Sequence, residues 1–201
     1  MINTIIFDLG AVLIDWNPHY LYRNLFEDEK QMLSFLTNIA TSDWNEEQDA
    51  GRSLAEGTEL LVKRFPEHEA NIRAFYGRWQ EMLGGAFENT VAILKQLKES
   101  GKYKIYALTN WSAETFPIAL ERYEFLSWFD GIVVSGTEKM RKPNPEFYEL
   151  LLTRYNVKAQ EALFIDDNLR NVLAAEKVGI QSIHYKSSGQ LKFELEQRNI
   201  L

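Results

Sequence analysis

The sequence has no cysteine among its 201 residues, which excludes disulfides, thiolate metal sites and a cysteine nucleophile. This absence is compatible with a reducing compartment. A surplus of positive charge is also lacking, because the formal net charge is −7. Nucleic-acid binding needs a basic face, and the longest basic cluster, KMRK at residues 139–142, is too short for a binding arm. We therefore expect no nucleic-acid partner.

Long apolar runs are missing as well. The first ten residues, MINTIIFDLG, carry no positively charged segment, and Asp8 interrupts their apolar run. We expect neither a signal peptide nor a membrane span, and we take the cytoplasm as the default location. With 45% hydrophobic residues, the chain can form one core, or one core with a smaller inserted domain.

Strand-like and helix-like segments alternate along most of the chain. The run TIIF at residues 4–7 is predicted to be a buried strand. From residue 90 onward, predicted helices separate four further strands, which have the sequences YKIYAL, DGIVVSG, ALFID and QSIHYK. This alternation is typical of an α/β fold with a doubly wound parallel sheet. We predict that residues 1–17 and 89–201 form this core.

Residues 18–88 have a different pattern. Segments such as HYLYRNLF and SLAEGTELLVKRF have the apolar spacing of helices, and the block has almost no strand signal. Because this block follows the first predicted strand, we expect a small helical cap domain above the strand ends.

Polar residues follow four of the predicted strands, where parallel sheets bind their ligands. Each has an ordinary explanation, since acids and Thr-Asn pairs often cap helices or form turns and a single lysine is usually solvated. Four such coincidences at one sheet edge favour a functional site instead. The residues are Asp8, Thr109, Asn110, Lys142, Asp166 and Asp167.

These residues carry a resemblance to a known family. The motifs FDLG, LTN, RKPNPEFY and FIDDN resemble, in order and spacing, those of the haloacid dehalogenase (HAD) superfamily over essentially the whole chain. The sequence is most similar to its phosphatases with a small helical cap, including those acting on glucose 1-phosphate. The resemblance implies a Mg²⁺-dependent phosphatase of a small phosphorylated metabolite, such as a sugar phosphate, as a monomer or homodimer.

The resemblance also assigns roles to the residues. Asp8 would attack phosphorus and form an aspartyl-phosphate intermediate. Asp8, Asp166, Asp167 and the backbone carbonyl of Gly10 would hold Mg²⁺, a cation that prefers oxygen ligands.

Other residues would contact the substrate. Lys142 would contact the phosphate and Asp8, and Thr109 and Asn110 would donate hydrogen bonds to phosphate oxygens. Arg52, in the sequence DAGRS, would reach a sugar hydroxyl or a second anion, although a surface ion pair explains it equally well. Asn171 would brace the acidic loop or cap a helix.

Gly10 departs from the family pattern. Most family phosphatases have an aspartate here that protonates the leaving group, and general acid–base catalysis is worth about 10² to 10⁴-fold. A sugar 1-phosphate would depend less on this acid because its leaving group is better. Asp15 and His19 are possible substitutes, but a turn and a surface helix explain them better.

Three other functions are alternatives to a phosphatase. A 2-haloacid dehalogenase would have no reason to gather Asp166 and Asp167 beside Asp8, because uncompensated carboxylates repel one another. A non-catalytic relict would not need the retained motifs, and a mutase would need the acid missing at Gly10. Among the aromatic residues, the candidates for pocket walls are Trp16, Trp44 and, best placed, Trp111.

Overall fold

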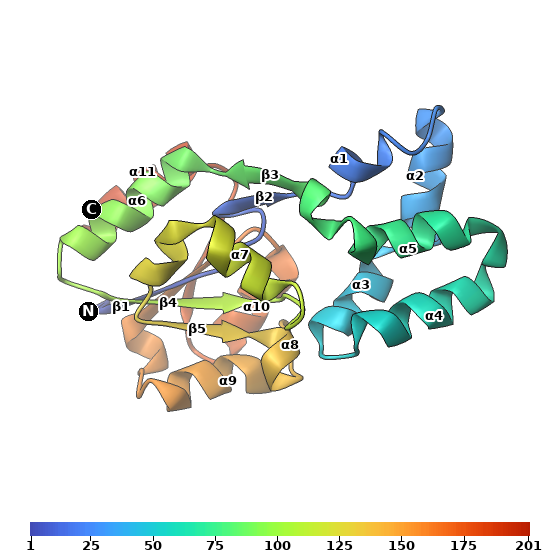
Figure 1. Cartoon of the computed structure of the whole chain (residues 1–201). Helices are drawn as coiled ribbons and strands as arrows, with labels where there is room; N and C mark the ends of the chain where they lie inside the picture. The colour runs from blue at the N-terminus through green and yellow to red at the C-terminus, as the bar shows by residue number, and fades with distance from the viewer.

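Five short strands form one parallel sheet, which is the centre of the molecule in the computed structural model of residues 1–201 (Figure 1). The strand order is β5-β4-β1-β6-β7. The strands are β1 (Thr4–Phe7), β4 (Lys104–Thr109), β5 (Gly131–Val134), β6 (Ala162–Asp166) and β7 (Gln181–His184). Crossover helices join the parallel strands, which confirms the predicted doubly wound α/β sheet.

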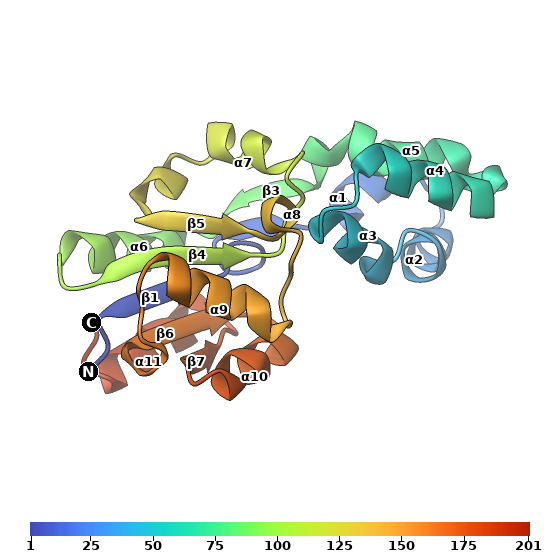
Figure 2. The same ribbon diagram turned by 90° about the horizontal axis from the view of Figure 1, so that it is seen from below.

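Helices cover both faces of the sheet (Figure 2). Side chains alternate along each strand, so Ile5 and Phe7 pack into one core and Ile6 packs into the other. The first core includes residues of α6 (Glu88–Glu99), α7 (Phe116–Arg122) and α11 (Ser188–Gln197). The second includes residues of α9 (Pro145–Arg154) and α10 (Leu169–Lys177). Burial on both faces explains why the central strands β1, β4 and β6 are rich in apolar residues.

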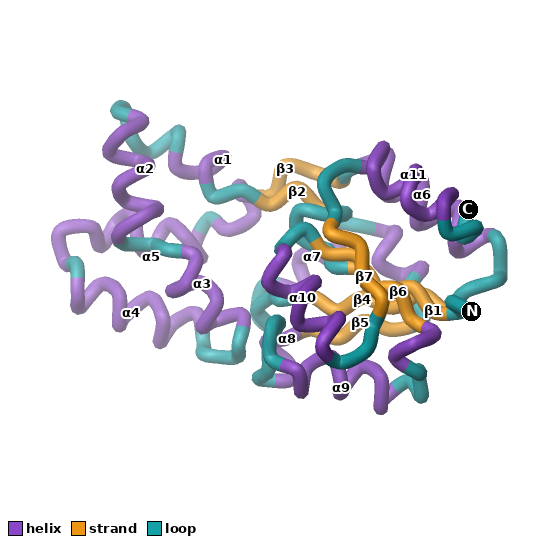
Figure 3. Tube along the Cα trace, turned by 180° about the vertical axis from the view of Figure 1, so that it is seen from behind, coloured by secondary structure: helices purple, strands orange, loops and turns teal.

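A block of helices lies beyond one end of the sheet (Figures 1 and 3). Its elements are α1 (His19–Tyr22), α2 (Glu29–Asn38), α3 (Ser42–Asp49), α4 (Leu54–Arg64) and α5 (Glu69–Gly77), with 3₁₀ turns at Pro66–His68 and Trp79–Met82. The side chains of Asp28, Thr41 and Ser53 cap α2, α3 and α4. The domain boundaries at residues 17/18 and 88/89 stay a prediction.

A second, antiparallel ribbon connects the block to the core. It pairs β2 (Ile14–Trp16) with β3 (Leu83–Ala86). β3 is thus the one strand within residues 18–88, a segment with almost no strand signal. Its sequence, LGGA, has low strand propensity, and the pairing with β2 overrides it. A side chain at Gly84 would collide with the Asp15 carboxylate, and Gly85 has a φ of +129°.

Short elements complete the chain. They are α8 (Ser135–Glu138) and the 3₁₀ turns Glu124–Trp128 and Ala159–Glu161. No helix has the length and apolar character that a bilayer crossing requires.

Candidate active site

The sheet brings the predicted motif residues to one edge. Asp8 directly follows β1, while Thr109 and Asp166 end β4 and β6, the two strands that flank β1. Because all three strands are parallel, their carboxyl ends lie together. The strand order therefore converts three distant sequence positions into neighbours.

Lys142 joins this edge from the loop that follows α8. Its side chain is fully buried, with Nζ 2.9 Å from Oδ1 of Asp8 and 2.7 Å from Oδ2 of Asp166. The Asn110 carboxamide holds the loop, since Nδ2 donates to the Lys142 carbonyl at 3.0 Å and Oδ1 accepts from the Lys142 amide at 2.9 Å. The side chain of Asn110 thus positions Lys142. The contact between Asn110 and a phosphate oxygen stays a prediction.

Asn171 braces the acidic loop. Its Nδ2 lies 3.1 Å from each carboxylate oxygen of Asp166, and the backbone amide of Asn168 donates to Asp166 Oδ1 at 2.8 Å. Asp166 is fully buried, so these donors and Lys142 compensate its charge. Its orientation is therefore fixed by several independent contacts.

Three carboxylates form a cluster suited to a cation. One oxygen from each of Asp8, Asp166 and Asp167 lies within 4.8 Å of the others. Burial raises the pKa of Asp8 to about 7, Lys142 opposes this shift, and the two neighbouring aspartates add to it. Burial and the charge of Asp166 also raise the pKa of Asp167. A hard divalent cation such as Mg²⁺ would relieve this repulsion, so the donor set fits it.

Thr109 offers a free hydroxyl at the same edge. Its side chain is 1% exposed, and its Oγ1 has no hydrogen-bond partner. An unsatisfied buried hydroxyl costs about 1 to 3 kcal/mol, so one that persists beside a charged cluster is suited to an oxygen-rich ligand.

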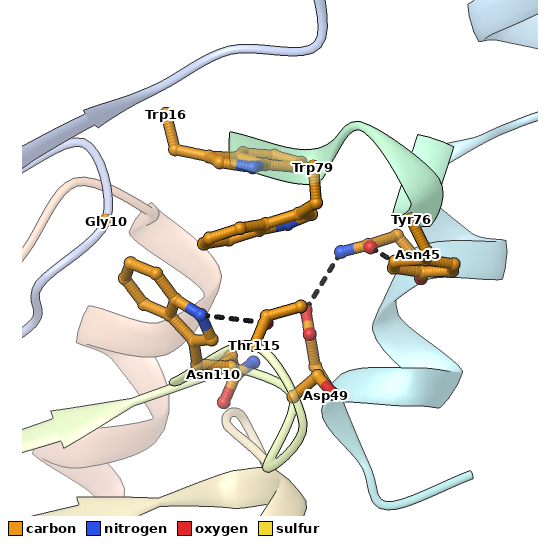
Figure 4. A pocket seen from close by; sticks show the side chains of 10 residues that line it. Gly10, Trp16, Asn45, Asp49, Tyr76, Trp79, Asn110 and Thr115 are labelled. Carbon is orange, nitrogen blue, oxygen red and sulfur yellow. Dashed lines mark hydrogen bonds between the residues drawn. The ribbon is translucent and has the colours of Figure 1, made fainter. Parts of the chain in front are cut away.

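A pocket of about 430 Å³ adjoins this edge (Figure 4). It lies between the sheet and the helical block, and both contribute to its walls. Trp111 and Trp16, two of the predicted aromatic walls, line it, whereas Trp44 packs against Phe75 and Tyr76. The lining residues are Gly10, Trp16, Asn45, Asp49, Tyr76, Trp79, Asn110, Trp111, Ser112 and Thr115.

Four pocket residues come from the helical block, and no sequence motif identifies them. They are Asn45, Asp49, Tyr76 and Trp79. Asn45 and Asp49 are four residues apart on α3 and so share one helix face, but this spacing alone does not distinguish a pocket wall from a solvated surface. Only the position of α3 over the sheet edge makes the difference.

Asp49 is the carboxylate of this pocket. Asn45 Nδ2 donates to its Oδ2 at 2.9 Å. Burial raises the pKa of Asp49 to about 7, and the nearby charge of Glu46 adds to the shift. The backbone amide of Ser112 and the charge of Arg141 oppose it. A carboxyl group in this state exchanges protons near neutral pH.

Of the predicted site residues, only Gly10 and Asn110 line the pocket, and the motif residues Asp8, Thr109, Lys142, Asp166 and Asp167 lie beside it at the sheet edge. Arg52, Asp15 and His19 are also absent from the lining. Arg52 donates to Gln48 Oε1 at 2.6 Å and to the Trp44 carbonyl at 3.3 Å, both in its own helical block. Asp15 accepts a hydrogen bond from Tyr20 at 2.6 Å, and His19 begins α1. The substrate contact of Arg52 stays a prediction.

Polar contacts hold the helical block against the core. The Ser135 hydroxyl donates to the backbone carbonyl of Asp49, which fixes the end of α3 over the sheet edge. Further contacts surround this point. They are Arg141–Glu47 at 3.0 Å, Arg170–Glu46 at 2.8 Å and the Leu54 amide to Glu114 at 2.8 Å.

Known proteins similar to this chain include a phosphatase and a pyrophosphatase. The family model described as haloacid dehalogenase-like hydrolase matches residues 2–179. A sesquiterpene phosphatase of Aspergillus oryzae is 33% identical over 193 residues, which cover 96% of this chain and 94% of that protein. A pyrophosphatase of Bacillus thuringiensis is 24% identical, and the match covers 90% of this chain and 82% of that protein.

Solved structures share the fold. A wild-type HAD family enzyme of Bacteroides thetaiotaomicron, in complex with magnesium and inorganic phosphate, has a TM-score of 0.68 at 20% identity and covers 93% of this chain and 96% of its own. An L-2-haloacid dehalogenase of Xanthobacter autotrophicus has a TM-score of 0.64 at 18% identity and covers 100% and 85%.

Proposed function

Because the chain belongs to the haloacid dehalogenase-like hydrolase family, we propose that it is a Mg²⁺-dependent phosphomonoesterase that works through an aspartyl-phosphate on Asp8. The observation that carries this proposal is the buried arrangement of Lys142 between Asp8 and Asp166, with Asp167 beside them. Phosphoryl transfer needs an in-line nucleophile and positive charge near the phosphate oxygens, and this cluster offers both.

The protein contacts of Asp8 indicate which oxygen reacts. Oδ1 accepts from the Leu9 amide at 2.7 Å and lies 2.9 Å from Lys142 Nζ, which leaves Oδ2 to form the bond to phosphorus. Lys142 and Thr109 would hold phosphate oxygens, and Asp8, Asp166, Asp167 and the Gly10 carbonyl would hold the metal ion. When bound, Mg²⁺ supplies charge that offsets the repulsion between nucleophile and phosphate.

A sugar phosphate is our first candidate substrate. The pocket combines indole faces with the polar groups of Asn45 and Asp49, a mixture suited to a ring that has both apolar faces and hydroxyls. A sugar 1-phosphate would also supply the better leaving group that the glycine at position 10 favours.

A second candidate is a sesquiterpenyl monophosphate. Three tryptophans, Trp16, Trp79 and Trp111, line the pocket and would contact an apolar chain. The Aspergillus relative named a sesquiterpene phosphatase supports this class. Turnover of farnesyl monophosphate and glucose 1-phosphate, compared by phosphate release, separates the two classes.

The first test uses p-nitrophenyl phosphate with Mg²⁺ and with EDTA, for the wild type and Asp8→Asn. We expect activity only for the wild type with metal. Activity that survives Asp8→Asn would remove the aspartyl-phosphate mechanism, and activity in EDTA would remove the metal requirement. If no phosphate ester reacts, chloride release from 2-chloropropionate tests the dehalogenase alternative.

A further inference from the structure

The space beside Gly10 is open. A Cβ built on this residue meets no atom within 4 Å, and its φ is not in the left-handed region. The glycine is therefore not required by sterics. It lines the same pocket as residues of the helical block, so a proton donor from that block would share the cavity with a substrate bound beside position 10.

Asp49 is the only carboxyl group that lines this pocket. Figure 4 shows its side chain extending from the helical block, with Trp79 on one side and Asn110 on the other. The other titratable lining residue, Tyr76, is engaged elsewhere, because its hydroxyl donates to Asn45 Oδ1 and accepts from Gln48 Nε2, each at 2.9 Å. Burial also raises the pKa of Tyr76 far above the neutral range.

We propose that Asp49 is the general acid and base of the reaction, supplied by the helical block in place of the side chain missing at Gly10. This inference rests on the proposed phosphatase function. It adds a catalytic residue that lies outside all four family motifs.

The proton balance of the two steps is simple. As Oδ2 of Asp8 bonds to phosphorus, the ester P–O bond breaks and its electron pair goes to the leaving oxygen, which takes the proton of Asp49. The Asp49 carboxylate then accepts a proton from the water that attacks the phosphorus of the aspartyl-phosphate, and the bond between phosphorus and Asp8 Oδ2 breaks with its electron pair returning to Asp8. Phosphate leaves, and both aspartates return to their starting state.

The surroundings of Asp49 suit this role. The hydrogen bonds that run from Gln48 through Tyr76 and Asn45 to Asp49 engage its Oδ2, and the backbone amide of Ser112 also donates to the carboxylate. The charged and titratable groups around it are Glu46 on its own helix, Tyr76 on α5 and Arg141 in the loop before Lys142. Burial and Glu46 outweigh Arg141, so the acid form persists to about neutral pH.

The test compares a substrate that needs an acid with one that does not. Asp49→Asn keeps the shape of the side chain and an acceptor for Asn45, but it cannot donate the proton. We measure kcat/KM for an alkyl phosphate, such as glycerol phosphate, and divide it by kcat/KM for p-nitrophenyl phosphate. We expect Asp49→Asn to lower this ratio about 10² to 10⁴-fold. Asp43→Asn, an exposed position on the same helix, is the matched control and should leave the ratio unchanged.

A rescue variant separates catalysis from structure. Gly10→Asp in the Asp49→Asn background places a carboxyl group in the open space. We expect the double variant to have a substrate ratio at least tenfold higher than that of Asp49→Asn alone. An unchanged ratio for Asp49→Asn, whether both substrates lose activity equally or neither does, would overturn the role of Asp49. If the wild type hydrolyses neither substrate, the phosphatase function itself fails, and this result is distinct from either of those.

Discussion

Replacing Lys142 with methionine removes the one cation that the protein itself places between Asp8 and Asp166. The ammonium is fully buried and lies within 2.9 Å of both carboxylates. Burial opposes its charge, but the two aspartates raise the pKa of Lys142 above its usual value, so the wild-type group stays charged. Methionine has a similar length and adds no cavity, so the change tests the charge rather than the volume.

The expected loss of stability is large. Removing one partner of a buried ion pair leaves an uncompensated charge and costs about 3 to 5 kcal/mol. For a chain of this size, 1 kcal/mol shifts the Tm by about 2 to 4 °C, so we expect a fall of roughly 6 to 20 °C at pH 8 without metal. The loss should shrink at pH 5, because the raised pKa of Asp8 allows that carboxyl to be neutral there.

The assay is thermal and urea unfolding in EDTA at both pH values. Lys158→Met is the matched control, since its side chain is 74% exposed and pairs with Glu161 at the surface. Exposed pairs contribute little, so its unfolding curve should overlay that of the wild type. If Lys142→Met unfolded like Lys158→Met at pH 8, our account of the buried charges would be wrong.

Three further predictions concern the sheet edge and the pocket beside it. Mg²⁺ at 100 times its Kd should stabilise the wild type by about 2.7 kcal/mol, and Asp167→Asn should reduce this gain in thermal unfolding. Thr109→Val should raise stability by about 1 kcal/mol, because it removes an unpaired buried hydroxyl, yet raise KM for p-nitrophenyl phosphate. The raised pKa of Asp49 means that its folded form binds more protons than the unfolded chain between about pH 4 and 7. Its contribution is present below this window and lost as pH rises through it, so Asp49→Asn should flatten the urea-derived stability profile by on the order of 1 kcal/mol.

The sheet was predictable because its central strands β1, β4 and β6 are buried on both faces. Continuous apolar runs such as ALFID, each followed by turn or cap residues, identify strands by local pattern alone. The parallel order then places Asp8, Thr109 and Asp166 together without further information. Lys142 was found through its motif, but its burial between two carboxylates depends on the clamp by Asn110, which no local pattern indicates.

The β2–β3 ribbon and the far wall of the pocket were not predictable in this way. Gly84 and Gly85 weaken any strand signal, and pairing with β2 supplies what propensity lacks. Asp49 has the sequence context of a solvated helix end. Its partial burial arises beside Ser135, Trp79 and Ser112, which come from distant segments. Contacts of such long sequence separation decide the environment of a residue whose own neighbours look ordinary.

The β2–β3 ribbon affects how the sequence of this protein can evolve. Asp15 pairs with Gly85 and Trp16 with Leu83, so the chain leaves the core and returns to it at adjacent points. The whole helical block thus occupies the place of a hairpin loop. Insertions, deletions or wholesale exchange of the block would leave the strand order and the phosphate-handling edge untouched. Substrate preference and the proton donor can therefore be inherited, lost or replaced as one module, while the nucleophile stays with the sheet.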